Sequence, residues 1–426
     1  MTASDASTRR ERQPFTPRTE CHEVARLRHD AATAAEHRFV SLQGVRYLPA
    51  IVLSLVILAI APFMSLLRDV LFARFGQGVI PALTVGVVAA CLASLAAAVW
   101  SIRTRRLLRW GGLMVVAVAL WLQVAGLSTG LPQVDAVEKI HIVEYGLLAV
   151  LLYRAALAGW RRSPHDGEAG PSLLVLPFLG VVLVGTLDEL TQWFFQLRVG
   201  EMRDVLLNLA AGSNGLLASL CVWPPRRLRA RPCRAERVRM LLTAALVVLV
   251  VGVFVDRAHL GHAIDDPEVG RFVSFHAPDE LQAAAVDRAW RWAAAPPQEL
   301  RAWAREDLFL TEAAFHVQHR NERKRAGDAY MAWQANRILE RWYGPFLDLE
   351  SFRGSGRHRW WPDGRDKIEQ SVFGAETPPP PPSVYRSPVL VGRVWLLPRT
   401  PFRVAVGLLA LTLAAAGLVA ARRRVA

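Results

Sequence analysis

The chain has 426 residues, of which 52% are hydrophobic, and its formal net charge is +14. Its mean hydropathy of +0.22 is high for a chain that is so rich in arginine, so the composition indicates a membrane protein rather than a soluble one. The arginines cluster beside apolar segments. We therefore attribute the positive charge to membrane topology and predict no nucleic-acid partner.

Eight apolar segments are candidates to cross a bilayer as helices, since about 20 residues span its hydrocarbon core, although two of them, 172–188 and 240–255, are short. In chain order they are residues 47–67, 79–100, 110–127, 140–158, 172–188, 205–223, 240–255 and 402–420. Pro177 is able to kink the fifth of them. The sequence predicts an all-α polytopic membrane bundle of about eight transmembrane helices.

The connections between these segments alternate in their content of basic residues. Residues 1–46 contain eight Arg and residues 224–239 contain seven, whereas residues 128–138 contain no Lys or Arg. Because basic loops stay in the cytoplasm during insertion, both termini are predicted to be cytoplasmic and residues 256–400 extracytoplasmic. The first apolar segment follows a long polar tail, so we expect a retained signal anchor and not a cleaved signal peptide.

We predict eight successive parts. They are a polar cytoplasmic tail (1–46), two N-terminal transmembrane helices (47–109), a transmembrane domain (110–223), a basic cytoplasmic loop (224–239), a transmembrane helix (240–255), a helical extracytoplasmic domain (256–376), a Pro-rich linker (377–401) and a C-terminal transmembrane helix (402–421). The four cysteines are absent from the extracytoplasmic domain, so no disulfide framework is expected.

Polar side chains gather near the ends of three predicted helices, on what the topology makes the outer side. Those that share a helix face are His141, Glu144 and Tyr145; Asp188 and Gln192; and Asp204 and Asn208. Ionisable groups near lipid cost several kcal/mol unless they face protein, water or a partner, so we interpret the set as a functional site. A structural alternative is that acidic groups at helix starts, Asp204 among them, only complement the helix dipole.

The order of these residues resembles that in the VanZ-like family of bacterial membrane proteins, over about residues 110–223. The matching positions are His141, Glu144, Tyr145, Gly146, Asp188, Glu189, Gln192, Arg198, Asp204, Asn208 and Gly212. One position differs, because members often have Lys three residues before the His and here Lys139 is two before it. The resemblance implies a multi-pass domain in the bacterial cytoplasmic membrane. The family's founding member is associated with lowered susceptibility to teicoplanin, and no reaction is established for the family.

The first hypothesis is a protein that acts on, or binds, cell-envelope lipid headgroups or lipid-linked precursors. Its candidate catalytic residues are His141, Glu144, Asp188, Glu189 and Asp204. Its candidate substrate-binding residues are Tyr145, Gln192, Arg198 and Asn208. Neighbouring carboxylates in a region of low dielectric have different pKa values, which suits one of them to act as an acid and another as a base.

Three alternatives remain open. Asp188, Glu189, Asp204 and His141 could bind a divalent cation, but their spacing matches no dedicated motif, so we predict no metal and leave the cofactor unknown. A non-catalytic envelope-binding or scaffold protein would use the same residues as a structural network, and the absence of a nucleophile elbow, phosphate loop or zinc motif favours it. A transporter is expected to show inverted repeats, which we do not detect. Whether the protein is an enzyme, and which proteins it binds, stays open.

The sequence also makes specific predictions for five segments of the predicted extracytoplasmic domain. Residues 278–295 begin with Pro-Asp-Glu, a helix-start signal, and the spacing of Ala335, Ile338 and Leu339 predicts a packed helix face. His316 and His319 are expected to be solvated, because no second pair of metal ligands follows. Residues 321–325 are expected to form a charged helix face, and residues 358–366 an irregular loop with an aromatic pair.

Overall fold

The computed structural model describes residues 45–63, 70, 73–76, 79–126, 132–161, 168–193, 200–295, 308–349, 358–374 and 395–422. The chain divides into two compact units, Met1–Pro49 and Ala50–Ala426. In the first unit the described residues 45–49 are helical, and the rest of the predicted cytoplasmic tail lies outside the described residues. Arg198 and the run of five prolines at 378–382 also lie outside them.

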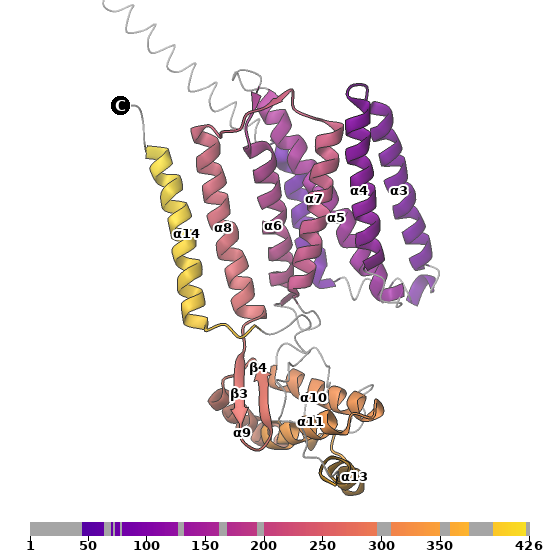
Figure 1. Ribbon diagram of the computed structural model, residues 1–426, viewed down its shortest axis with the longest axis vertical. Coiled ribbons are helices and arrows are strands. Elements are labelled where there is room, and N and C mark those ends of the chain that lie inside the picture. The colour runs from indigo at the N-terminus through magenta and orange to yellow at the C-terminus, as the bar shows by residue number, and fades with distance from the viewer. Residues whose placement is uncertain are drawn as a thin grey trace, which may run out of the picture. The chain divides into compact units, whose positions relative to one another are not determined.

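Within the described residues of the second unit, six helices are long and apolar enough to cross a membrane (Figure 1). They are α4 (Arg106–Gly126), α5 (Pro132–Arg161), α6 (Ser172–Trp193), α7 (Met202–Val222), α8 (Arg234–Ala258) and α14 (Arg399–Arg422). A helix of 21 residues, such as α4, is about 32 Å long, enough for the hydrocarbon core. The prediction of a multi-pass helical membrane protein is confirmed.

The two remaining predicted spans are helical as well. α3 (Val79–Ser101) is an apolar helix of 23 residues. Residues 45–60 form a shorter apolar helix, Val45–Ile60, which is followed by the 3-10 turn η1 (Ala61–Phe63). Six predicted spans therefore coincide with candidate spans, and the total of eight stays a prediction.

Two helix boundaries differ from the sequence prediction. α6 continues to Trp193 instead of ending near residue 188, because the polar side chains in its last turn are buried. Pro177 lies inside this helix. α8 begins at Arg234 instead of residue 240. There the carboxylate of Glu236 accepts a 2.8 Å hydrogen bond from the Cys233 N–H and one of 2.9 Å from Arg229. The short parallel strands β1 (Glu168–Ala169) and β2 (Arg227–Leu228) pair near this helix start.

α7 is the centre of the bundle, since it packs against α4, α5 and α6, while α8 packs against α6 and α14. α5 and α7 approach closely at two glycines, because a Cβ atom on Gly215 would clash with the carbonyl oxygen of Gly146. α14 is joined to α8 by Arg403, which donates to both carboxylate oxygens of Asp256 at 2.9 and 3.0 Å.

The chain between α8 and α14 forms a second region with its own core. It contains the antiparallel strands β3 (His262–Asp266) and β4 (Gly270–Ser274), and the helices α9 (Pro278–Ala294), α10 (Leu308–Arg325), α11 (Ala329–Trp342), α12 (Gly344–Leu347) and α13 (Pro362–Phe373). The hairpin corrects the prediction of a purely helical domain. Its turn ends at Gly270, whose φ of +83° favours glycine, and the hairpin buries Ile264 and Phe272 in the core.

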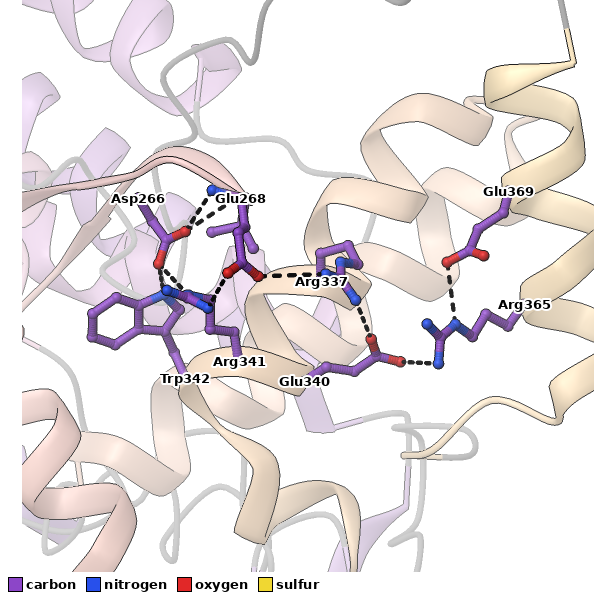
Figure 2. A network of polar contacts seen from close by, with 9 residues as sticks. Asp266, Glu268, Arg337, Glu340, Arg341, Trp342, Arg365 and Glu369 are labelled. Atoms are coloured by element: carbon purple, nitrogen blue, oxygen red, sulfur yellow. Dashed lines mark hydrogen bonds and ion pairs between the residues drawn. The ribbon is translucent and has the colours of Figure 1, made fainter.

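A chain of charged contacts joins this hairpin to α11 and α13 (Figure 2). Asp266 accepts hydrogen bonds from Arg341 and from the indole N–H of Trp342, the latter at 3.2 Å. From there the chain runs through Glu268, Arg337, Glu340, Arg365 and Glu369. Burial raises the pKa of Asp266, but hydrogen bonds from backbone N–H groups and Arg341 outweigh it, so the pKa is lowered.

Several expectations for this region can be compared with the structure. The helix start at Pro278 and the charged face at residues 321–325 are confirmed, and Ala335, Ile338 and Leu339 are buried as predicted. The expectation that His316 and His319 are solvated is wrong, because they are only 0% and 8% exposed and pack among aromatic rings. Residues 358–366 are only partly irregular, since α13 begins at Pro362.

Candidate functional site

α5 begins, α6 ends and α7 begins at one end of the bundle, because each connection reverses the chain direction (Figure 1). This arrangement brings two predicted site residues into direct contact. The Tyr145 hydroxyl donates a 2.8 Å hydrogen bond to Oδ2 of Asp188, and both residues are no more than 1% exposed. The contact connects the polar face of α5 with that of α6, as the sequence led us to expect.

Asn208 extends this cluster to α7. A Cβ atom on Gly185, which lies one turn before Asp188 on α6, would be 3.1 Å from Cβ of Asn208 and 3.4 Å from the Tyr145 ring. Asn208 is 1% exposed, and neither its Nδ2 nor its Oδ1 atom has a hydrogen-bond partner in the described part of the chain. A buried amide without partners costs on the order of 1–3 kcal/mol, which makes Asn208 a candidate contact for a polar ligand group.

His141 and Glu144 form the more accessible edge of the cluster. Nδ1 of His141 lies 3.7 Å from Oε2 of Glu144, and the two side chains are 14% and 26% exposed. The imidazole also lies parallel to the Tyr145 ring, with centroids 6.1 Å apart. An imidazole beside a carboxylate is a suitable pair for proton transfer. The Tyr145 ring lies between this pair and the carboxylate of Asp188 and so connects the two.

Glu189 and Gln192 have a different environment. Oε1 of Glu189 accepts a 3.1 Å hydrogen bond from Gln192, and Oε2 accepts one of 2.9 Å from the backbone N–H of Glu201. Glu189 is fully buried, so the pair links the end of α6 to the residue that precedes α7. The catalytic role predicted for Glu189 stays a prediction, and these contacts show that it also holds the local backbone.

Asp204 lies in the first turn of α7, one turn before Asn208 and on the same face. Its backbone N–H donates to the Glu201 carbonyl oxygen at 3.1 Å, and its side chain is half-buried. This position suits both interpretations of Asp204, as a member of the site and as an acid that complements the positive end of the helix dipole.

Two residues that the sequence analysis overlooked support the cluster. Nε2 of His259, at the end of α8, accepts a 3.1 Å hydrogen bond from the Met202 N–H at the start of α7, and its ring stacks on Trp395 at 5.3 Å. Gln123 of α4 donates to the Leu207 carbonyl oxygen at 3.1 Å. A glutamine inside an apolar span is a detectable signal, whereas a single histidine after a span is not.

The described residues contain no group of three or more His, Cys, Asp or Glu that could hold a metal ion. What the cluster does offer is a phenol, a buried amide, an imidazole and three carboxylates, those of Glu144, Asp188 and Asp204. Such a set can bind hydroxyl or ammonium groups and can move a proton.

Comparisons of the chain with models of protein families, with curated proteins and with solved structures found no match. The resemblance to the VanZ-like family therefore rests on the motif residues alone.

Proposed function

We propose that the protein binds, and acts on, the headgroup of a cell-envelope lipid or lipid-linked precursor at the cluster formed by α5, α6 and α7. The observation that carries the proposal is Asn208, which lies beside Gly185, itself next to the Tyr145 ring, and whose buried amide has no hydrogen-bond partner among the described residues. A ligand group that fills this position would remove the cost of the unpaired amide.

The charge of the cluster favours a particular kind of headgroup. Glu144, Asp188 and Asp204 are acceptors when ionised, so they suit a ligand that is rich in donors. Hydroxyl groups of sugars and glycerol, or the ammonium of an aminoalcohol, supply such donors. A phosphate would need a cation, and we propose Arg198 for that contact because it belongs to the sequence motif, although it lies outside the described residues.

In this proposal the residues divide into two layers. His141 and Glu144 are partly exposed and exchange a proton with a ligand hydroxyl, while Tyr145 and Asp188 hold the ligand from beneath. Asp204 and Asn208 add contacts from α7. Because the family's founding member is associated with teicoplanin susceptibility, an effect on glycopeptide susceptibility belongs to the same proposal.

The proposal also places the cluster and residues 256–400 on the outer side of the bacterial cytoplasmic membrane, with both termini inside. The number of basic residues in the loops supports this placement. A cysteine introduced as Asp287→Cys, in a chain whose native cysteines are replaced by serine, is expected to react with a membrane-impermeant maleimide in intact cells. One introduced as Arg231→Cys is expected to react only after lysis.

A second candidate function has its own support. The contacts of Glu189 with Gln192 and with the Glu201 N–H are those of a structural network, which suits a non-catalytic binding or scaffold protein. In that case the cluster stabilises the bundle and changes no lipid.

The two candidates differ in what happens to envelope lipids. We would compare lipids and lipid-linked intermediates by mass spectrometry in cells that express wild type, Asp188→Asn or Asp204→Asn at matched membrane levels. Asp287→Asn, on the exposed surface of α9, is the matched control. A species that changes with wild type and the control, but with neither site variant, supports lipid chemistry. Identical profiles in all four strains would favour the scaffold.

A further inference from the structure

A pocket of about 330 Å³ lies between the end of α10 and the start of α13, in the region between α8 and α14. Its lining consists of Asn321, Lys324, Arg325, Trp360, Trp361 and Gly364. Volumes of this size are typical of sites for small ligands. The pocket shares no residue with the cluster of α5, α6 and α7, so an inference about it stands independently of the function proposed above.

Trp360 is held in place by two cations. The Arg320 guanidinium lies 4.7 Å from the centroid of its ring, and the Lys324 ammonium lies 5.2 Å from it. Arg320 is fully buried and donates a 2.9 Å hydrogen bond to Oδ1 of Asn336, so one of these cations is fixed inside the fold. Such contacts orient an aromatic ring, and Trp360 therefore forms a rigid wall of the pocket.

The neighbouring segments are anchored as well. His358, two residues before Trp360, is buried and stacks on Phe346 with ring centroids 4.4 Å apart. On the other side, Arg365 of α13 forms ion pairs with Glu340 of α11 and with Glu369 (Figure 2). Trp361 lies between these two anchors and is 64% exposed, so its indole is presented to solvent on a fixed backbone.

Lys324 and Arg325 give the pocket a positive charge that the fold does not neutralise. Both are exposed, and neither forms an ion pair within the part of the chain that the structure describes. Their neighbour Arg323, by contrast, pairs with Asp328 at 3.4 Å. Gly364 lies beside the Lys324 ammonium, since a Cβ atom at this position would be in ordinary van der Waals contact with it, at 3.7 Å. An exposed pair of cations beside fixed indoles suits an anion that has an apolar face.

We propose that this pocket binds an acidic saccharide. The C–H groups on one face of a sugar ring carry a partial positive charge and pack against the negative face of an indole, here Trp361. The carboxylate or phosphate of the same sugar then pairs with Lys324 and Arg325, and Asn321 is placed for a ring hydroxyl. A nucleic-acid strand fits less well, because it needs several stacking surfaces along a continuous basic groove.

Binding of a uronic-acid hexasaccharide to the purified full-length protein in detergent tests the proposal, with a neutral glucose hexasaccharide for comparison. Lys324→Gln and Trp361→Ala are each expected to weaken binding of the acidic saccharide by about tenfold, and Lys324→Arg is expected to retain it. The matched controls are Lys367→Gln, an exposed lysine of α13, and Trp290→Ala, a tryptophan of α9 that is 77% exposed. Both controls are expected to bind like wild type.

The source of the saccharide is distinguished by a second measurement. It uses phosphatidylcholine vesicles with and without phosphatidylinositol, because the headgroup of phosphatidylinositol carries a sugar-like ring and a phosphate. Binding to these vesicles that Trp361→Ala abolishes assigns the pocket to a lipid headgroup, and binding to the soluble saccharide alone assigns it to a glycan.

Three results would overturn the proposal: equal binding of the neutral saccharide, unchanged affinity in Lys324→Gln and Trp361→Ala, or tighter binding of a single-stranded oligonucleotide. Because both substituted side chains are exposed, and the buried Arg320 still lies over the Trp360 ring in Lys324→Gln, the midpoint of thermal unfolding should not change, and this is checked on the same samples.

Discussion

The hydroxyl of Tyr145 on α5 donates a 2.8 Å hydrogen bond to the carboxylate of Asp188 on α6, and both residues are shielded from solvent. They are 43 residues apart in the chain, so the contact depends on how the helices pack. Around it lie Asn208 of α7 and the partly exposed pair His141 and Glu144. The function that we propose for this protein depends on this cluster of side chains.

The first prediction concerns Tyr145→Phe, which removes the donor to Asp188. Interhelical hydrogen bonds in membranes contribute about 1 kcal/mol, so we expect a loss of stability of this size, measured as the free energy of unfolding in mild detergent. Tyr153→Phe is the matched control, because the Tyr153 hydroxyl donates a 2.7 Å bond to the Trp223 carbonyl oxygen near the other end of the bundle. Only Tyr145→Phe is expected to alter lipid chemistry. An altered lipid profile in Tyr153→Phe would show that lost stability, and not the site, is the cause.

The second prediction concerns Asn208→Leu, which keeps the branched shape and the number of heavy atoms of the side chain but removes its polar groups. Because the Asn208 amide has no hydrogen-bond partner in the described residues, its removal should leave the protein as stable or raise the free energy of unfolding by about 1 kcal/mol, while activity is lost. Asn214→Leu, on the same helix, removes a 3.4 Å hydrogen bond to Gln123 and should be destabilising. If Asn208→Leu unfolded more readily than Asn214→Leu, Asn208 would be a structural residue rather than a ligand contact.

The third prediction concerns Gly215→Ala, which places a Cβ atom against the carbonyl oxygen of Gly146 where α5 and α7 are closest. The helices would have to separate, so we expect a loss of roughly 1–3 kcal/mol and a lower midpoint of thermal unfolding. Gly111→Ala on α4 is the control, because nothing lies within 4 Å of the added atom. Equal midpoints for the two variants would contradict the close helix contact.

The fourth prediction concerns pH and the region between α8 and α14. Burial lowers the pKa of His316 from 6.5 to about 3, and burial followed by the charge of Arg323 lowers that of His319 to about 4. Below pH 6.5 the unfolded chain binds protons that the folded chain does not. Stability is therefore complete above pH 6.5 and falls as the pH decreases, by up to about 1.4 kcal/mol per pH unit for each histidine.

Hydrogen–deuterium exchange of α10 and α11 measures this effect, after correction for the intrinsic exchange rate. Protection is expected to fall between pH 7 and pH 5 in wild type, and less in His316→Leu, which removes one of the titrating groups. The same loss of protection in His316→Leu and wild type would contradict the assignment to His316.

The membrane helices could be predicted because their apolar residues form uninterrupted runs, as in α8 and α14. The apolar run underestimated the length of α6, because Asp188, Glu189 and Gln192 interrupt it and are buried only by α5 and the start of α7, although the spacing of Asp188 and Gln192 did predict a shared helix face. The strands β3 and β4 were also unpredicted. Charged residues such as Asp265 and Arg271 alternate with the buried Ile264 and Phe272, and the segment directly follows an apolar helix.

Helical spacing and the predicted topology led us to expect the polar faces of α5, α6 and α7 at one side of the membrane, but not the particular contact between Tyr145 and Asp188. The sequence did not predict that the Asn208 amide lacks a hydrogen-bond partner among the described residues, nor did it predict the hydrogen bonds of His259 and Gln123. These features depend on which helices are neighbours. The burial of His316 and His319 could not be predicted for the same reason. Two histidines one turn apart give no indication of burial until the surrounding aromatic residues are placed.

The central claim is that the cluster of α5, α6 and α7 changes a lipid headgroup. The most direct measurement incubates purified protein in nanodiscs made from bacterial envelope lipids and follows the lipids by mass spectrometry over time. We predict that wild type converts one headgroup class, that Asp188→Asn and Asn208→Leu do not, and that Asp287→Asn behaves like wild type. If wild type and Asp188→Asn give the same lipid profile at every time, the claim is contradicted and the cluster has a structural role.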